Sequence, residues 1–522
     1  MKKAGGLACG GGLRHDFVVY HAQSDARRHA PARGAAKVTD GMAKTTNSKT
    51  LPRPDLCVIG AGAAGLSVAA SAALMGAQVV LIEQARMGGD CLNSGCVPSK
   101  ALIAAARAAQ GVREAGRFGI SARAPGVDRA AVKRHVDAVI AEIAPVDSVA
   151  RYRALGAEVI EGEARFVDPS TVMVGERTIK ARRFVIASGA AATVPPIPGL
   201  DDVPYLTHET IFALTETPKR LAIIGGGPIG IELAQAHRRL GSDVTVFEAE
   251  RILPREDVDA ARLIARVLER EGVRLIEYAR IRAVSGGAGA IRIDVEGEHL
   301  RKGQTFTHLL VATGRAPRVE GLGLEAAGVR YTARGIEVDQ SQRSSNPRIY
   351  AIGDCAGGAQ FTHAASHQAG IVIRNALFRL PAKRQDSLIP RVTFTDPEIA
   401  AVGLNEDSAQ ASGARGVTAL RWPLAENDRA RIDGATDGFA KIVTDGRGRI
   451  LGVTLAGGHA GEQINLWTLA MRQKLTVSAI IDLVMPYPTY SEAARRAALN
   501  SLTPKLRSPW IGRMIRLMRV FG

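Results

Sequence analysis

A glycine-rich turn occurs twice in this chain, each time after a run of apolar residues and before a stretch of helix-forming residues. The apolar runs are L-C-V-I at residues 56–59 and R-L-A-I-I at residues 220–224. Glycines with G-x-G-x-x-G spacing between a strand and a helix are typical of a parallel βαβ unit that binds the pyrophosphate of a dinucleotide. The sequence therefore predicts two such units. Their glycines are Gly60, Gly62 and Gly65 in the first unit and Gly225, Gly227 and Gly230 in the second.

An acidic residue ends the strand that follows each turn. Glu83 and Glu248 each lie 23 residues after the first glycine of their unit, where a carboxylate can accept hydrogen bonds from a ribose. A carboxylate binds a 2′-hydroxyl and repels a 2′-phosphate, so Glu248 favours NADH over NADPH. Arg251 lies close enough in the sequence to oppose that preference. Two dinucleotide sites in one chain imply electron transfer between two cofactors.

Residues 56–82 contain no charged side chain and are long enough to span a bilayer. The glycine turn and Gly76 divide this segment into a strand, a turn, a helix and a second strand, as expected for a buried parallel unit. We therefore predict a βαβ unit here and not a transmembrane helix.

The string C-L-N-S-G-C-V-P-S-K at residues 91–100 places Cys91 five residues before Cys96. Two inert buried thiols or a zinc site are alternatives, but the spacing and the lack of a nearby His fit zinc poorly. In an ideal helix five residues rise roughly 7.5 Å, which is too far for a disulfide. We expect a distorted turn at Gly95, followed by a helix with Pro98 in its first turn. That helix N-terminus and Lys100 would favour a thiolate at Cys96, which indicates a redox-active dithiol.

This string resembles the class I pyridine nucleotide–disulfide oxidoreductases, the group of dihydrolipoyl dehydrogenase, glutathione reductase and mercuric reductase. The resemblance extends from about residue 54 to residue 503. It includes A-S-G at 187–189, A-T-G-R at 312–315, Y-A-I-G-D-C-A-G-G at 350–358 and T-F-T-D-P-E-I-A-A-V-G at 393–403. It implies an α/β fold with two Rossmann-like dinucleotide-binding domains, for FAD and for NAD(P), and an α+β interface domain that forms a homodimer.

The domain boundaries expected from this resemblance divide the chain into six parts. They are a basic leader (1–53), the first part of the FAD domain (54–203), the NAD(P) domain (204–320), the second part of the FAD domain (321–388), the interface domain (389–504) and a basic amphipathic tail (505–522).

The resemblance also implies roles for individual residues. Cys96 would be the charge-transfer thiol against the flavin, Cys91 the interchange thiol that meets the acceptor, and Lys100 would pair with Glu232 beside flavin N5. Electrons would pass from NAD(P)H through the flavin to the dithiol and on to an acceptor. FAD would be bound by Gly60, Gly62, Gly65, Glu83, Ser188, Gly189 and Asp354, with Asp354 on the ribityl chain. The nicotinamide cofactor would be bound by Gly225, Gly227, Gly230, Glu248 and Gly314.

One motif departs from the pattern of the members that act on thiols. Those members carry His-Pro-Thr-x-Ser-Glu near the C-terminus, where the His is a general acid–base supplied by the partner subunit. Here Tyr487 replaces the His, while Glu492 remains. A phenol has an unperturbed pKa of about 10 and is a poor base at neutral pH.

Mercuric reductase resembles this chain in having Tyr at that place, but it also uses two adjacent cysteines at its C-terminus to deliver Hg(II). This sequence has no Cys after Cys355. We therefore expect a mercuric-reductase-like enzyme that acts on a metal ion or another non-thiol acceptor. A dihydrolipoyl-dehydrogenase-like disulfide reductase is the alternative. Apart from the two cysteines as soft ligands, we expect no metal-binding site.

The net charge of +17 is concentrated at the two ends of the chain. Residues 1–53 hold ten Lys and Arg against three Asp, and residues 495–522 hold seven Lys and Arg and no acid. The region between them is close to neutral and shows no nucleic-acid-recognition motif, so no nucleic-acid partner is expected. The leader lacks the apolar run of a secretory signal, and either Met1 or Met42 could be its start. We expect a cytoplasmic protein.

Residues 510–522 predict a helix with apolar residues on one side and Arg513, Arg516 and Arg519 on the other. Such a helix can lie on an anionic membrane surface, or it can dock on its own subunit or on the dimer. In the first case the protein could also act as a flavin-bearing adaptor for a membrane or a partner.

Overall fold

The structure is a computed structural model that describes residues 53–297, 304–502, 506 and 508–521. Most of the predicted leader lies outside the described residues. Around the first glycine turn, five parallel strands form a sheet in the order β18-β7-β1-β2-β3. The strands are β1 (Leu56–Ile59), β2 (Val79–Glu83), β3 (Glu158–Glu161), β7 (Arg183–Ile186) and β18 (Ile349–Ala351).

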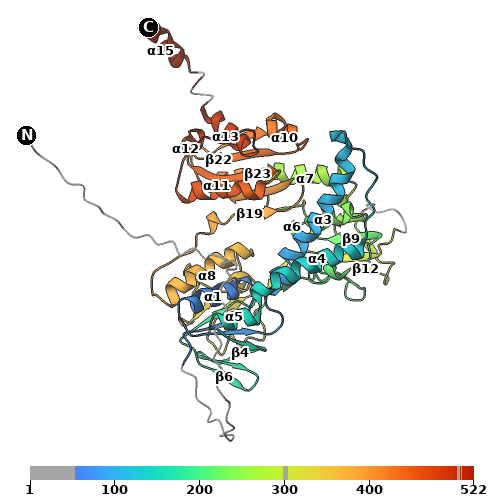
Figure 1. The fold of residues 1–522 in the computed structure, drawn as a ribbon, viewed down its shortest axis with the longest axis vertical. Coiled ribbons are helices and arrows are strands. Elements are labelled where there is room, and N and C mark those ends of the chain that lie inside the picture. Colours follow the sequence, from blue (N-terminus) through green and yellow to red (C-terminus); the bar gives the residue numbers. More distant parts are fainter. Residues whose placement is uncertain (1–52, 298–303, 503–505, 507, 522) are drawn as a thin grey trace, which may run out of the picture.

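The uncharged segment folds as strand, helix and strand because its apolar side chains face the core on both sides of the sheet. β1 is buried along its whole length, and helix α1 (Ala63–Leu74) packs against helix α8 (Thr362–Ala376) on one face. Figure 1 shows these two helices side by side above the strands. Among the described residues, no helix combines the length and the apolar character needed to cross a bilayer.

The second glycine turn belongs to a separate parallel sheet, in the order β11-β10-β9-β14. Its strands are β9 (Arg220–Ile224), β10 (Asp243–Phe247), β11 (Arg274–Ile276) and β14 (His308–Val311). Helix α6 (Pro228–Arg239) follows the turn, and helix α7 (Val258–Arg270) follows β10. After β14 the chain returns and contributes β18 to the first sheet, so the first unit is built from two separate parts of the sequence.

The third sheet is antiparallel, in the order β19-β20-β23-β22-β21. Helices α11 (Ala460–Arg472) and α13 (Ser491–Leu499) pack on it around the buried side chain of Trp467. Its strands are β19 (Arg391–Thr393), β20 (Glu398–Gly403), β21 (Thr418–Pro423), β22 (Phe439–Thr444) and β23 (Ile450–Gly457). Two parallel units and one α+β unit confirm the predicted fold class.

Helix α3 (Cys96–Glu114) joins the three units. It begins beside the first sheet and packs against α6 of the second unit and against α4 (Arg129–Ile143). Two chain segments cross between the parallel units. The outgoing segment pairs Leu206 with Leu310 of β14, and the returning segment contains β15 (Arg315–Pro317), which pairs with β8 (Ala190–Ala192).

The helix predicted near the C-terminus forms as α15 (Pro509–Met518). None of its residues is buried, and Figure 1 shows it projecting beyond the third unit. In the structure of the single chain this helix therefore does not dock on its own subunit.

The glycine turns allow each helix to begin very close to its strand. A Cβ on Gly65 would lie 1.8 Å from the Gly60 carbonyl oxygen, and a Cβ on Gly230 would lie 2.0 Å from the Gly225 oxygen. Gly60 and Gly225 themselves have φ of +102° and +113°. Only glycine fits these positions without displacing backbone.

Gly65→Ala should therefore lower the free energy of unfolding by about 3 kcal/mol or more, at the upper end of overpacking costs. Gly111→Ala in α3 is the matched control, because nothing lies within 4 Å of its added Cβ. That change should stabilise the protein by up to about 1 kcal/mol through helix propensity. Thermal denaturation of both variants measures the difference, and equal melting temperatures would contradict the packing argument.

Candidate active site

A cavity of about 2080 Å³ opens between the two parallel units, where both glycine turns reach it. Such a position, at the carboxyl ends of parallel strands, is where open α/β sheets bind ligands. Of the residues expected at the site, fourteen line the cavity. They are Gly60, Gly62, Glu83, Cys91, Cys96, Lys100, Ser188, Gly189, Gly225, Gly227, Glu232, Glu248, Gly314 and Asp354. Gly65 and Gly230 do not line it, since they pack each helix on its own turn.

The middle glycine of each turn leaves room for a ligand. Gly62 and Gly227 precede the first residues of α1 and α6, and neither helix has a side-chain cap. A Cβ on Gly62 would come no closer than 3.8 Å to another atom, and a Cβ on Gly227 would have no neighbour within 4 Å. A side chain here would instead fill the cavity above free helix N–H groups. The two turns thus fit the phosphates of two dinucleotides.

The two acidic residues brace their turns in the same way. Glu83 accepts hydrogen bonds from the amides of Ala61 at 2.6 Å and Ala85 at 2.8 Å. Glu248 accepts from the amides of Gly226 and Glu250, the latter at 3.0 Å. Each carboxylate has about four acceptor positions, so capacity remains for ribose hydroxyls.

The side chain of Arg251 is engaged with the backbone away from the cavity. Arg251 donates to the carbonyl oxygens of Leu253, Pro254 and Glu256 at 2.9–3.0 Å and does not line the cavity. Arg255 lines it instead. Arg251 therefore stabilises the loop that follows β10.

Cys91 and Cys96 lie on either side of a break between two helices. Helix α2 (Gly89–Asn93) carries Cys91, and α3 begins at Cys96. At Ser94 and Gly95 the backbone leaves the helical conformation, with φ of −146° and −115°. This is the distorted turn that the spacing predicts. Both cysteines are free thiols in this structure.

The two thiols have opposite electrostatic character. A hydrogen bond from Cys91, outweighing burial and aided by Thr362 and Lys100, lowers the pKa of Cys96 to about 6. The Cys96 sulfur lies 3.6 Å from Thr362 Oγ1. The same hydrogen bond, together with burial, raises the pKa of Cys91. At neutral pH Cys96 is therefore mainly a thiolate and Cys91 a protonated thiol.

Lys100 and Glu232 meet at the cavity wall. Lys100 Nζ donates to Glu232 Oε2 at 2.9 Å and lies 4.5 Å from the centre of the Phe394 ring. The other oxygen of Glu232 accepts from the Phe394 amide at 2.8 Å. One carboxylate thus connects α3, α6 and the segment after β19.

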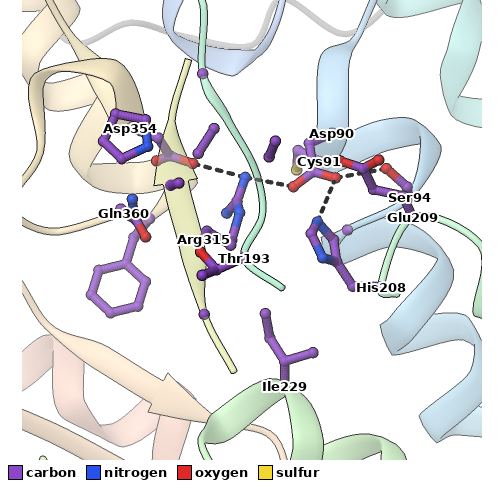
Figure 2. Close-up of a pocket in the computed structure, with 18 of the residues that line it drawn as sticks. Asp90, Cys91, Ser94, Thr193, His208, Glu209, Ile229, Arg315, Asp354 and Gln360 are labelled. Carbon is purple, nitrogen blue, oxygen red and sulfur yellow. Dashed lines mark hydrogen bonds and ion pairs between the residues drawn. The ribbon is translucent and has the colours of Figure 1, made fainter. Parts of the chain in front are cut away.

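A second charged cluster in the cavity was not found from the sequence. Arg315 lies between Asp354, at 2.8 Å, and Asp90, at 2.6 Å. His208 Nε2 lies 3.4 Å from the other oxygen of Asp90. Figure 2 shows Asp90 at the centre of these contacts. Asp90 directly precedes Cys91, and Arg315 is the last residue of the A-T-G-R motif, so both lie in or beside motifs noted in the sequence. No motif in the sequence includes His208.

Tyr487 and Glu492 do not line the cavity of their own chain. Tyr487 is exposed and its hydroxyl donates to Asp428 at 3.0 Å, a contact that raises the pKa of the phenol. Glu492 pairs with Arg496 at 3.1 Å and not with Tyr487. Among the described residues no group of three or more His, Cys, Asp or Glu is arranged to bind a metal ion.

This fold and site define a class of flavin-dependent oxidoreductases. Residues 54–369 match the family model for pyridine nucleotide-disulphide oxidoreductase, and residues 389–498 match the dimerisation domain of the same proteins. The chain belongs to this family, as its resemblance predicted. Its members are FAD-dependent oxidoreductases that use pyridine nucleotides.

Individual relatives cover most of the chain. A mercuric reductase of Bacillus cereus is 36% identical over 449 residues, which are 85% of this chain and 71% of the relative. A dihydrolipoyl dehydrogenase of Chlamydia muridarum is 34% identical over 468 residues, which are 87% of this chain and 98% of the relative. A solved Cu(II) complex of the HOCl-induced flavoprotein disulfide reductase RclA from Escherichia coli aligns with a TM-score of 0.75 and 30% identity. It covers 84% of this chain and 98% of that structure.

The Cys91 hydrogen bond predicts how two substitutions differ. In Cys91→Ser the hydroxyl still donates to Cys96, so the pH midpoint for forming the Cys96 thiolate should stay close to the wild-type pKa of about 6. In Cys91→Ala the donor is lost, and the midpoint should rise. The rate at which iodoacetamide alkylates Cys96, followed against pH by peptide mass spectrometry, measures both. Equal midpoints in the two variants would exclude this hydrogen bond as the cause.

Proposed function

We propose that this protein uses NAD(P)H, preferentially NADH, to reduce a Cys91–Cys96 disulfide and then passes the electrons to a non-thiol acceptor. NADH and one proton reduce the disulfide to two thiols, giving NAD⁺. The dithiol then gives two electrons to the acceptor, reforms the disulfide and releases two protons. The observation that carries the proposal is the pair of unlike thiols in a cavity that two glycine turns also reach.

The residues at the cavity have distinct proposed tasks. FAD, when bound, supplies two-electron transfer between the nicotinamide and the disulfide. The turn at Gly60, with Glu83, Ser188, Gly189 and Asp354, would hold FAD. The turn at Gly225, with Glu248 and Gly314, would hold the nicotinamide cofactor. Lys100, kept in place by Glu232, holds a positive charge near the Cys96 thiolate.

The proposed domains keep the boundaries expected from the sequence. FAD binds to 54–203 and 321–388, NAD(P)H to 204–320, and 389–504 forms the interface of a homodimer. The match of residues 389–498 to the dimerisation domain supports the homodimer. Tyr487 and Glu492 lie in that region, outside their own cavity, so they would act at the cavity of the partner subunit.

The preference for NADH rests on the acids around the second turn. Glu248 and Glu250 both line the cavity there, and Arg251 is engaged with backbone carbonyls. Two carboxylates disfavour a 2′-phosphate, and Arg255, which lines the cavity in the same loop, opposes them. The balance of charge therefore supports NADH.

A thiophilic metal ion is the acceptor class that the site supports best. Thiolates are the soft ligands that such ions prefer, and Cys91 and Cys96 provide two of them. A relative is named a mercuric reductase, and a similar structure is a Cu(II) complex, which support this choice. A dihydrolipoyl-dehydrogenase-like activity is the alternative, since such an enzyme is also a relative.

Tyr487→His separates these two acceptors. With the wild type we expect NADH oxidation in the presence of Hg(II) or Cu(II). We expect slow turnover of lipoamide or glutathione disulfide, because Tyr487 is a poor base. The histidine should raise lipoamide turnover by about 100-fold, at the lower end of general acid–base effects.

An NADH-oxidation assay over these acceptors gives the comparison, with NADPH in parallel and Tyr490→Phe as a nearby control. Tyr490 bonds Asp433 at 2.9 Å, away from the cavity, so its loss should leave the acceptor preference unchanged. Rapid lipoamide turnover by the wild type, with no gain in Tyr487→His, would favour the dihydrolipoyl-dehydrogenase alternative.

Helix α15 supports a second proposal, that the protein contacts an anionic membrane surface from the cytoplasm. Its apolar residues are exposed, Trp510 by 63% and Met518 by 62%. Its two arginines, Arg513 and Arg516, and Arg519 just after the helix provide charge complementary to anionic lipid. The same contact would let the protein act as a flavin-bearing adaptor.

Deletion of residues 505–522 should abolish flotation with vesicles containing phosphatidylglycerol while leaving soluble NADH oxidation unchanged. Replacing Arg513, Arg516 and Arg519 with glutamine should weaken binding by about 100-fold, at about 1 kcal/mol per charge. Vesicles of phosphatidylcholine alone are the control. Unchanged flotation of the truncated protein would remove this proposal.

A further inference from the structure

Asp90 contacts three other side chains, and no role has been proposed for it above. Its carboxylate accepts a hydrogen bond from the Ser94 hydroxyl at 2.6 Å, forms an ion pair with Arg315 at 2.6 Å and lies 3.4 Å from His208 Nε2. Ser94 is part of the turn between the two cysteines, so one contact braces that turn directly. The other two contacts come from distant parts of the sequence.

Those distant contacts come from the two segments that cross between the parallel units. His208 lies on the outgoing segment, two residues after Leu206, which bridges to β14. Arg315 begins β15 on the returning segment. Asp354, in the short helix η4 (Gly353–Ala356), holds the same guanidinium from the first unit. Figure 2 shows Arg315 between the two carboxylates.

We infer that Asp90 is a positioning residue for the redox reaction, because its carboxylate ties the Cys91-bearing helix to both segments that link the two nucleotide-binding units. The inference rests on the proposed dithiol function. Electron transfer requires a fixed position of the nicotinamide, bound to one unit, relative to the cysteines of the other unit. The contacts of Asp90 can fix this relative position directly beside the cysteines.

The contacts of Asp90 also pair it with a cation beside the cysteines. Arg315 bridges Asp90 and Asp354, so the carboxylate that adjoins Cys91 is held from the returning segment and, through the same guanidinium, from the first unit.

The test uses FAD-loaded enzyme and the long-wavelength charge-transfer absorbance that NADH produces. Asp90→Asn should slow the growth of this band by about 10- to 100-fold, the effect of misplacing reacting groups. The amplitude of the band per bound flavin should also fall, because the turn that carries the cysteines is no longer held in place. Asp90→Glu keeps the charge and moves it, so it should also slow the reaction.

Asp294→Asn, an exposed carboxylate on β13 (Arg292–Val295), is the matched control and should change neither quantity. Asp90→Asn with an unchanged rate, or with an unchanged amplitude per bound flavin, overturns the inference, since a loss of stability alone would lower the FAD content and not the amplitude per bound flavin. If Asp90→Asn loses FAD, His208→Gln takes its place, because it removes one tie and leaves the Arg315 ion pair. His208→Gln should slow the band about three- to tenfold, and a wild-type rate would overturn the inference.

The same measurement keeps this inference separate from the proposed function. A wild type that binds FAD but develops no charge-transfer band with NADH contradicts the proposed dithiol mechanism. A wild type that develops the band, with variants that behave identically, contradicts only the role of Asp90.

Discussion

The contact between Lys100 and Glu232 is the point on which the arrangement of the three units depends. Lys100 belongs to the helix that begins at Cys96, and Glu232 belongs to the helix that begins at the second glycine turn. Because Glu232 also accepts from Phe394, the third unit is fixed at the same place. Further along α3, Arg107 pairs with Glu398 at 3.0 Å. These contacts hold the cysteines and the second glycine turn on one cavity wall.

The parts of the structure that the sequence predicts well are those decided by local geometry. The glycine turns at Gly60 and Gly225 follow from steric limits within a few residues, and the break at Gly95 follows from the distance that two cysteines can bridge. The pairing of Lys100 with Glu232 is different, because 132 residues separate them. Only the resemblance to a family indicated that contact.

Residues that meet only after the chain has folded leave no local pattern. Asp90, His208 and Arg315 lie on three separate elements, and their spacing in the sequence carries no signal. The sequence could not show where the Arg251 side chain lies, since nearness to Glu248 in the sequence does not fix its direction, and in the structure it donates to backbone carbonyl oxygens. For α15, the sequence predicts its amphipathic character but leaves open whether it docks. The structure shows that it does not dock within the single chain.

The state of the two thiols also limits the acceptor. Cys91 has a raised pKa, so attack on a disulfide substrate would need a base to remove its proton. Tyr487 is a poor candidate, because its contact with Asp428 raises the phenol pKa further. A thiophilic metal ion needs no such base, since binding to a thiol itself displaces the proton. Cys96 has a lowered pKa of about 6 and would provide the first ligand. Tyr487 in place of the histidine and the raised pKa of Cys91 thus both favour a thiophilic metal ion as the acceptor, because its reaction with the thiols needs no base.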